Sequence, residues 1–148
     1  MRLVQNIKLF RPTKLLLVPV IAETIYRRIM AEKKKNPLLP LKLAGQAVFG
    51  KDLKVIFCGG AYLAPELTEA YAKMGLPLLQ GYGMTECSPR ITSSSQADPS
   101  TGLDVGRVVK NCRVRIQDGE IQVQSPSVML GYYRSEEATR EMFTEDGW

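Results

Sequence analysis

The residues best suited to chemistry lie in one short stretch, Gln80-Gly81-Tyr82-Gly83-Met84-Thr85-Glu86-Cys87-Ser88-Pro89. Its glycines allow the backbone to approach a ligand closely. Thr85 offers a hydroxyl to a phosphate oxygen, and Glu86 offers a carboxylate to a hydrated magnesium ion. This combination predicts nucleotide handling. A bare Gly-x-Gly more often marks a tight turn, so the residue types alone leave a purely structural turn open.

A strand, a helix and a second strand precede this stretch. The apolar run 53–58 predicts a strand covered on both faces, and 65–74 predicts a helix with Pro65 in its first turn and Gly75 just past its end. A second strand over 76–79 leads into the stretch. This order is typical of a βαβ unit, whose two strands are parallel.

Two glycine bends follow the two strands of this unit, Gly59-Gly60-Ala61 after the first and Gly81 to Glu86 after the second. In an open parallel sheet, ligands bind beyond the carboxyl ends of the strands, where helix N-termini present free N–H groups. We therefore expect the two bends to flank one crevice.

In the rest of the chain, apolar residues recur with a helical spacing in one part and with a strand spacing in another. Residues 14–18 predict a strand that ends at Pro19, a stripe at Ile21, Ile25 and Ile29 predicts an amphipathic helix, and 41–49 predicts a short helix. Alternation with period two predicts a hairpin that turns at Asp118-Gly119, and Ser135 is expected to cap a terminal helix. Residues 91–102 are predicted to form a solvated loop.

These patterns predict an α/β fold: a parallel βαβ part over residues 1–102 and a small β subdomain with a terminal helix over 103–148. Three strings add a resemblance: GYGMTECSP, KVIFCGGAYLAPEL, and GEIQVQSPSVMLGYYRSEEATREMFTEDGW. In order and spacing they resemble the motifs of the AMP-forming adenylating enzymes, which include acyl-CoA synthetases, luciferases and the adenylation domains of peptide synthetases. The resemblance runs from Lys54 to Trp148.

The resemblance implies an enzyme that joins a carboxylic acid to AMP from ATP and then passes the acyl group to CoA. It implies that Gly59, Gly60 and Ala61 form a backbone wall, that Tyr82 stacks on adenine, and that Gln80 meets the adenine edge. Gly81 and Gly83 complete the nucleotide loop, Thr85 contacts phosphate, and Glu86 holds Mg²⁺. From residue type, Tyr132, Tyr133 and Trp148 are expected to be packing residues. Cys87 is expected to be a small apolar spacer, with a reactive thiol as the alternative.

The residues of KLFRPTKLLLVPV and of the two glycine motifs most resemble those of medium- or long-chain fatty acyl-CoA synthetases. Three parts of that family have no match here: the phosphate-binding loop with its lysine, the Thr-Gly-Asp segment, and the C-terminal domain with the catalytic lysine. We expect an internal fragment without turnover of its own. A non-catalytic nucleotide-binding remnant and a peptide-synthetase piece remain alternatives.

Composition and charge limit the kinds of catalytic site, location and partner that this chain can have. The 148 residues are 45% hydrophobic and include three cysteines and no histidine, which excludes a Ser-His-Asp apparatus and predicts reduced thiols. No apolar run is long enough to span a membrane, so a cytoplasmic location is expected. Residues 1–54 carry a net charge of +9. We interpret these charges as solvated helix faces, with binding to an anionic partner as the alternative. The basic region contains no recognisable nucleic-acid-binding motif. Exposed sheet edges predict self-association.

Overall fold

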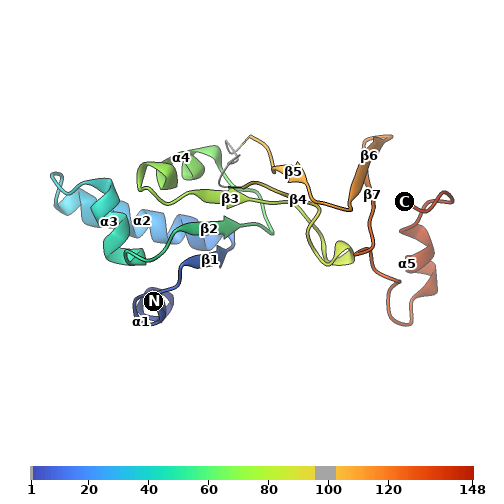
Figure 1. Cartoon of the computed structure of the whole chain (residues 1–148), viewed down its shortest axis with the longest axis horizontal. Coiled ribbons are helices and arrows are strands. Elements are labelled where there is room, and N and C mark those ends of the chain that lie inside the picture. The colour runs from blue at the N-terminus through green and yellow to red at the C-terminus, as the bar shows by residue number, and fades with distance from the viewer. Residues whose placement is uncertain (1, 96–102) are drawn as a thin grey trace.

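The structure is a computed structural model that describes residues 2–95 and 103–148. Figure 1 shows an α/β body at one end and a β hairpin with a short helix at the other. The body contains α1 (Arg2–Phe10), β1 (Lys14–Leu17), α2 (Pro19–Lys35), α3 (Leu41–Phe49), β2 (Val55–Cys58), α4 (Pro65–Lys73) and β3 (Leu78–Gln80). The remainder contains the 3₁₀ turn η1 (Thr85–Cys87), β4 (Thr92–Ser93), β5 (Arg107–Val108), β6 (Arg113–Gln117), β7 (Glu120–Gln124) and α5 (Glu136–Glu141).

The body is built on a three-stranded parallel sheet in the order β1-β2-β3. Leu17 pairs with Cys58, and Cys58 pairs with Gln80, so the three strands end at the same level. This confirms the predicted parallel βαβ unit. The glycine bends at Gly59 and Gly81 begin directly after paired residues, which places both bends at the carboxyl edge of the sheet.

Helix α2 begins at Pro19, two residues before the predicted start. Proline suits the first helical position because its φ is already helical and its missing N–H would have no partner there. The residue that ends the strand therefore also starts the helix. Ile25 and Ile29 are buried, as the i+4 stripe predicts, whereas Ile21 is half-buried and the neighbouring Ala22 is buried.

Tyr71 of α4 connects three helices in the core. Its side chain is fully buried, and its hydroxyl donates a hydrogen bond to the carbonyl oxygen of Ala22 in α2 at 2.9 Å. Its ring packs against the ring of Phe49 in α3, with the centroids 5.9 Å apart. Gly75 ends the helix with a φ of +74°, as expected for the residue after a helix C-terminus.

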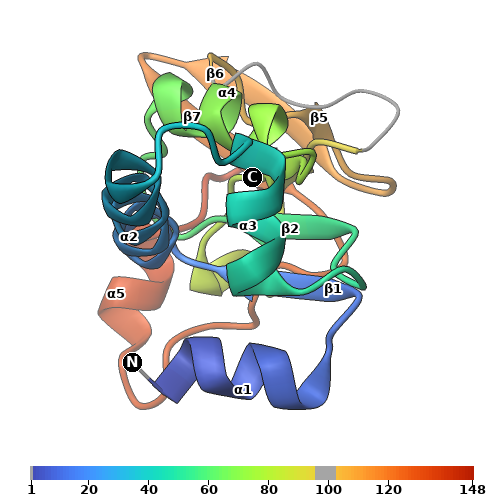
Figure 2. The same ribbon diagram turned by 90° about the vertical axis from the view of Figure 1, so that its left-hand side faces the viewer.

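The sequence patterns did not predict helix α1. It lies beyond β1 at the edge of the sheet (Figures 1 and 2), with Ile7 buried and Leu9 and Phe10 exposed. Leu16 of β1 is also exposed. The predicted self-association rests on exposed sheet edges rather than on these side chains, and it stays a prediction.

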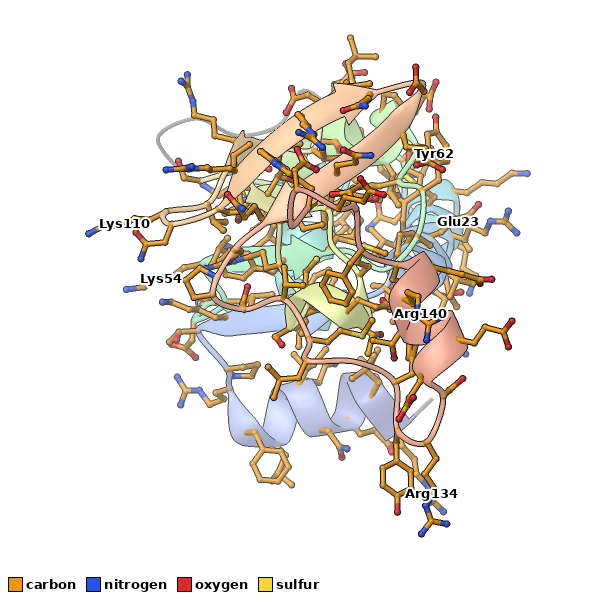
Figure 3. The ribbon with its side chains drawn as sticks, turned by 90° about the vertical axis from the view of Figure 1, so that its right-hand side faces the viewer. Glu23, Lys54, Tyr62, Lys110, Arg134 and Arg140 are labelled. Carbon is orange, nitrogen blue, oxygen red and sulfur yellow. The ribbon has the colours of Figure 1, made fainter. Side chains whose placement is uncertain are left out.

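The hairpin of β6 and β7 confirms the period-two pattern. Asp118 and Gly119 have φ values of 52° and 83°, the backbone that a two-residue turn of type I′ requires. Figure 3 shows this end of the molecule, with Arg140 on α5 and Arg134 projecting from the preceding loop. Ser135 precedes α5, but its side chain makes no capping hydrogen bond.

The division between residues 1–102 and 103–148 stays a prediction. Strands β4 and β5 stand on opposite sides of it and pair with each other, with Thr92 opposite Val108. Within the described residues, no helix is both long and apolar enough to cross a membrane.

The C-terminal turn is fixed to the hairpin by Arg115. Its guanidinium donates two hydrogen bonds to the Asp146 carboxylate, at 2.7 and 3.0 Å, and lies 4.5 Å from the centroid of the Trp148 ring. Arg115 and the Thr144 hydroxyl both donate to Asp146 and lower the pKa of its carboxyl to about 2.

This geometry predicts the acid response of the turn. Because the pKa of Asp146 is lower in the folded chain than the ordinary value of about 3.9, its stabilising contribution is present above about pH 4 and is lost as the pH falls toward about 2. The fluorescence of Trp148, the one tryptophan in the chain, should change with a midpoint near 2. In Arg115→Gln the midpoint should rise, and a wild-type midpoint near 4 would contradict the prediction.

Candidate functional site

The two glycine bends lie against each other, as predicted. The Gly81 N–H donates to the carbonyl oxygen of Cys58 at 3.4 Å, and a Cβ added to Gly59 would lie 3.3 Å from the carbonyl oxygen of Gly81. A cavity of about 690 Å³ opens at this point. Six of the predicted site residues line it: Gly59, Gly60, Gln80, Gly81, Tyr82 and Gly83.

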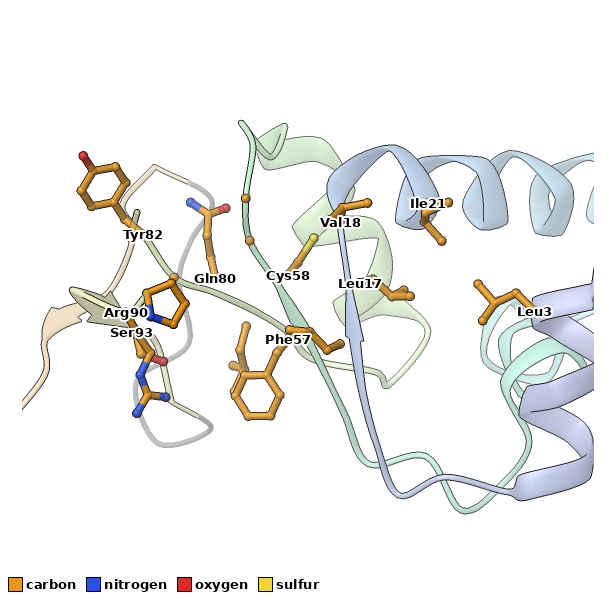
Figure 4. A pocket seen from close by; sticks show the side chains of 17 residues that line it. Leu3, Leu17, Val18, Ile21, Phe57, Cys58, Gln80, Tyr82, Arg90 and Ser93 are labelled. Atoms are coloured by element: carbon orange, nitrogen blue, oxygen red, sulfur yellow. The ribbon is translucent and has the colours of Figure 1, made fainter. Parts of the chain in front are cut away.

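The cavity is apolar at one end and polar at the other. Figure 4 shows Leu3, Leu17 and Ile21 at the end away from Tyr82. Arg90 and Ser93 lie at the opposite end, beside the motif loop. The arrangement offers apolar surface to one part of a ligand, and a guanidinium with backbone polar groups to another.

The motif loop doubles back on itself. Gly83 forms an antiparallel bridge with Arg90, and the Met84 N–H donates to the carbonyl oxygen of Pro89 at 2.8 Å. A Cβ on Gly83 would overlap that same carbonyl. The second glycine of the motif is therefore required by close backbone packing within the loop, and η1 forms the loop's tip.

The prediction of a solvated loop is wrong for residues 91–94, because Ile91, Thr92 and Ser94 are buried. The Ser94 hydroxyl donates to the carbonyl oxygen of Gln80 at 2.6 Å and accepts from the Gln80 N–H at 2.9 Å. The Thr92 hydroxyl accepts from the Tyr82 N–H at 3.1 Å and donates to the carbonyl oxygen of Val105 at 2.6 Å. A hydroxyl can both donate and accept, so these polar residues satisfy buried backbone groups. Residues 96–102 of the predicted loop lie outside the described part.

Gln80 is positioned by a segment that the sequence patterns did not single out. Its side-chain Nε2 donates to the carbonyl oxygen of Asp104 at 2.9 Å, and its Oε1 is buried with no hydrogen-bond partner among the described residues. Gly106 has a φ of +83°, and a Cβ there would overlap the backbone of Ser93 and Ser94. The one sequence signal for this segment is Gly106 itself.

Three predicted site residues, Ala61, Thr85 and Glu86, do not line the cavity. Thr85 and Glu86 stand on η1, at the tip of the motif loop. The Glu86 carboxylate accepts a hydrogen bond from the Tyr132 hydroxyl at 2.7 Å, which lowers the pKa of Glu86. Tyr132 is therefore not the simple packing residue that the sequence predicted.

Neighbours of Glu86 define its chemistry further. Cys87 is buried, and burial raises the pKa of its thiol, in agreement with the predicted apolar spacer. Among the described residues, no group of three histidine, cysteine, aspartate or glutamate side chains gathers to hold a metal. Any divalent ion here would have Glu86 as its one motif carboxylate.

Known proteins are similar to this chain in sequence. The chain is 40% identical over 111 residues to luciferin 4-monooxygenase of Luciola mingrelica, covering 66% of this chain and 20% of that protein. It is 34% identical over 119 residues to 2-succinylbenzoate–CoA ligase of Bacillus cytotoxicus, covering 73% and 24%. It is 38% identical over 104 residues to long-chain-fatty-acid–CoA ligase FadD15 of Mycobacterium bovis, covering 70% and 17%. The chain thus spans a quarter or less of these relatives.

Solved structures show the same fold. The anthranilate CoA ligase AuaEII in complex with anthranoyl-AMP superposes with a TM-score of 0.76 at 17% identity, over 99% of this chain and 30% of that one. Apo MatB from Rhodopseudomonas palustris gives 0.75 at 24% identity, over 99% and 28%. The family of AMP-binding enzymes matches residues 1–133. Since that match covers most of the chain, the protein belongs to the AMP-binding enzymes, the AMP-forming adenylating superfamily.

Proposed function

We propose that this chain forms the adenylate-binding edge of an AMP-forming acid–CoA ligase, which activates a carboxylic acid with ATP and transfers it to CoA. The observation that carries the proposal is the meeting of the Gly59 and Gly81 bends at one cavity, beyond the carboxyl ends of parallel strands. Because the chain spans a quarter or less of its curated relatives, we expect no turnover from these 148 residues alone.

The nucleotide end of the ligand is assigned to the motif loop. Tyr82 stands at the polar end of the cavity, about one third exposed, where its ring can stack on adenine. Gln80 presents a buried Oε1 without a partner among the described residues, which suits an amino group on the adenine edge. Gly59 and Gly60, which line the cavity beside Gly81, supply the backbone wall.

The phosphate end is assigned to Thr85 and Glu86. Magnesium is usually held by one or two carboxylates together with phosphate oxygens and waters, so a single glutamate fits this ion. Bound there, the ion would neutralise charge on the phosphates. The hydrogen bond from Tyr132 favours the ionised form of Glu86, which is the form that binds a cation.

A fatty acid is our proposed substrate. The cavity wall consists largely of aliphatic and aromatic side chains, which are complementary to an alkyl chain. They come from α1, α2, the three strands and the residue between β1 and α2: Leu3, Leu16, Leu17, Val18, Ile21, Phe57 and Leu79. The fatty-acid ligase among the relatives supports this choice, and the 2-succinylbenzoate ligase supports a ring-bearing acid instead.

Calorimetric titration with non-hydrolysable acyl sulfamoyl adenosines tests both the adenylate site and the fatty acid substrate. The dodecanoyl compound should bind at least about tenfold more tightly than the acetyl compound, because each buried methylene contributes about 0.8 kcal/mol. A 2-succinylbenzoyl compound serves as the competing substrate class. Equal affinity for all acyl groups would contradict the fatty acid, and no binding of any of them would contradict the adenylate site.

A further inference from the structure

Glu86 is held at two points by one short segment. Its backbone carbonyl oxygen accepts a hydrogen bond from the Met129 N–H at 2.7 Å, and its carboxylate Oε1 accepts one from the Tyr132 hydroxyl at 2.7 Å. Both donors lie in the link between β7 and α5, more than forty residues along the chain from η1. The segment thus fixes both the backbone and the side-chain direction of Glu86.

Tyr132 is itself held by helix α5. The Tyr132 N–H donates to the Thr139 hydroxyl at 2.8 Å, and that hydroxyl donates to the carbonyl oxygen of Ser135 at 2.8 Å. The neighbouring Gly131 has a φ of +151°, and a Cβ there would lie 2.8 Å from Thr139 Cγ2. A glycine therefore lets the loop approach α5 closely enough for the Thr139 contact.

We propose that Tyr132 is a positioning residue for Glu86: supported by Thr139 of α5, it holds Oε1 and thereby directs the other carboxylate oxygen toward a phosphate-bound cation. This inference rests on the proposed function for the cation, whereas the fixing of the side chain by Tyr132 does not. Outer groups that hydrogen-bond to a metal ligand typically change metal affinity about 10–100-fold when removed, because they fix the ligand's orientation.

The chain offers a matched pair of variants. Tyr132→Phe removes the hydroxyl and keeps the ring. Tyr133→Phe makes the same change at the adjacent position, where the side chain is exposed and lies against Arg134, with the guanidinium 5.1 Å from the ring centroid. Thr139→Val removes the support of Tyr132 while keeping the shape of the side chain.

The first measurement needs no ligand. Nuclear magnetic relaxation of the Glu86 carboxyl carbon should show increased side-chain motion in Tyr132→Phe, a smaller increase in Thr139→Val, and none in Tyr133→Phe. If Tyr132→Phe leaves the motion of Glu86 unchanged, the positioning role is overturned.

The second measurement is calorimetric titration with ATP, with and without Mg²⁺. Tyr132→Phe should reduce the gain in affinity that Mg²⁺ brings by about tenfold and leave Mg²⁺-free binding within twofold of wild type. A general loss of folding would weaken both equally. If the wild type gains nothing from Mg²⁺, the metal role in the proposed function fails. An equal gain in wild type and Tyr132→Phe overturns the positioning role instead.

Discussion

Gly83→Ala should lower the free energy of unfolding by about 1–3 kcal/mol, the usual cost of overpacking, and should abolish binding of acyl-adenylate analogues. The added Cβ would overlap the carbonyl group of Pro89, which already accepts the Met84 N–H. Because the obstacle is backbone rather than a movable side chain, the two arms of the loop must separate. Tyr82 would then leave its position at the cavity, and η1 would leave its position at the tip of the loop.

Denaturant unfolding and calorimetry with the dodecanoyl analogue measure the two effects. Gly119→Ala is the control, because it introduces the same methyl group at a φ of +83° with no atom within 4 Å. That variant should lose about 1 kcal/mol from backbone strain and bind the analogue as wild type does. If Gly83→Ala binds as tightly as Gly119→Ala, the packed hairpin is not what forms the site.

Tyr71→Ala should be the most destabilising single change in the α/β body, at about 3–5 kcal/mol, the range for truncating a large buried aromatic side chain. The change removes the ring that packs on Phe49, and it removes the side-chain hydrogen bond to the carbonyl oxygen of Ala22. Helices α2, α3 and α4 lose the side chain that all three contact. Their packing against the sheet that carries both glycine bends should weaken as a result.

Tyr71→Phe separates the two contributions. It keeps the ring and removes the hydroxyl, and it should cost about 0.5–1.5 kcal/mol, the net contribution of one hydrogen bond, because the carbonyl of Ala22 keeps its bond within α2. Urea unfolding followed by circular dichroism gives both values. A loss below 1 kcal/mol in Tyr71→Ala would mean that the three helices are held together elsewhere.

Much of the fold could be predicted from local pattern. The strand, helix and strand over 53–79 follow from an apolar run, from Pro65 and Gly75 as boundaries, and from a second apolar run, each acting within a few residues. The hairpin turn at Asp118-Gly119 follows from residues that tolerate positive φ. Helix α1 was missed because its short helical pattern is completed only by burial of Ile7 against the body.

The residues of the motifs were sufficient to indicate the family. The meeting of the two glycine bends at one sheet edge could also be predicted from the sequence, because each bend directly follows a strand of one parallel unit. Only the tertiary structure showed which groups four further residues contact: Thr92, Ser94, Gly106 and Tyr132. Their roles depend on partners 10 to 46 residues away, such as Tyr82 for Thr92 and Glu86 for Tyr132. A serine that holds a buried backbone group and a serine in a solvated loop look the same along the chain, because the difference lies in what the fold brings beside them.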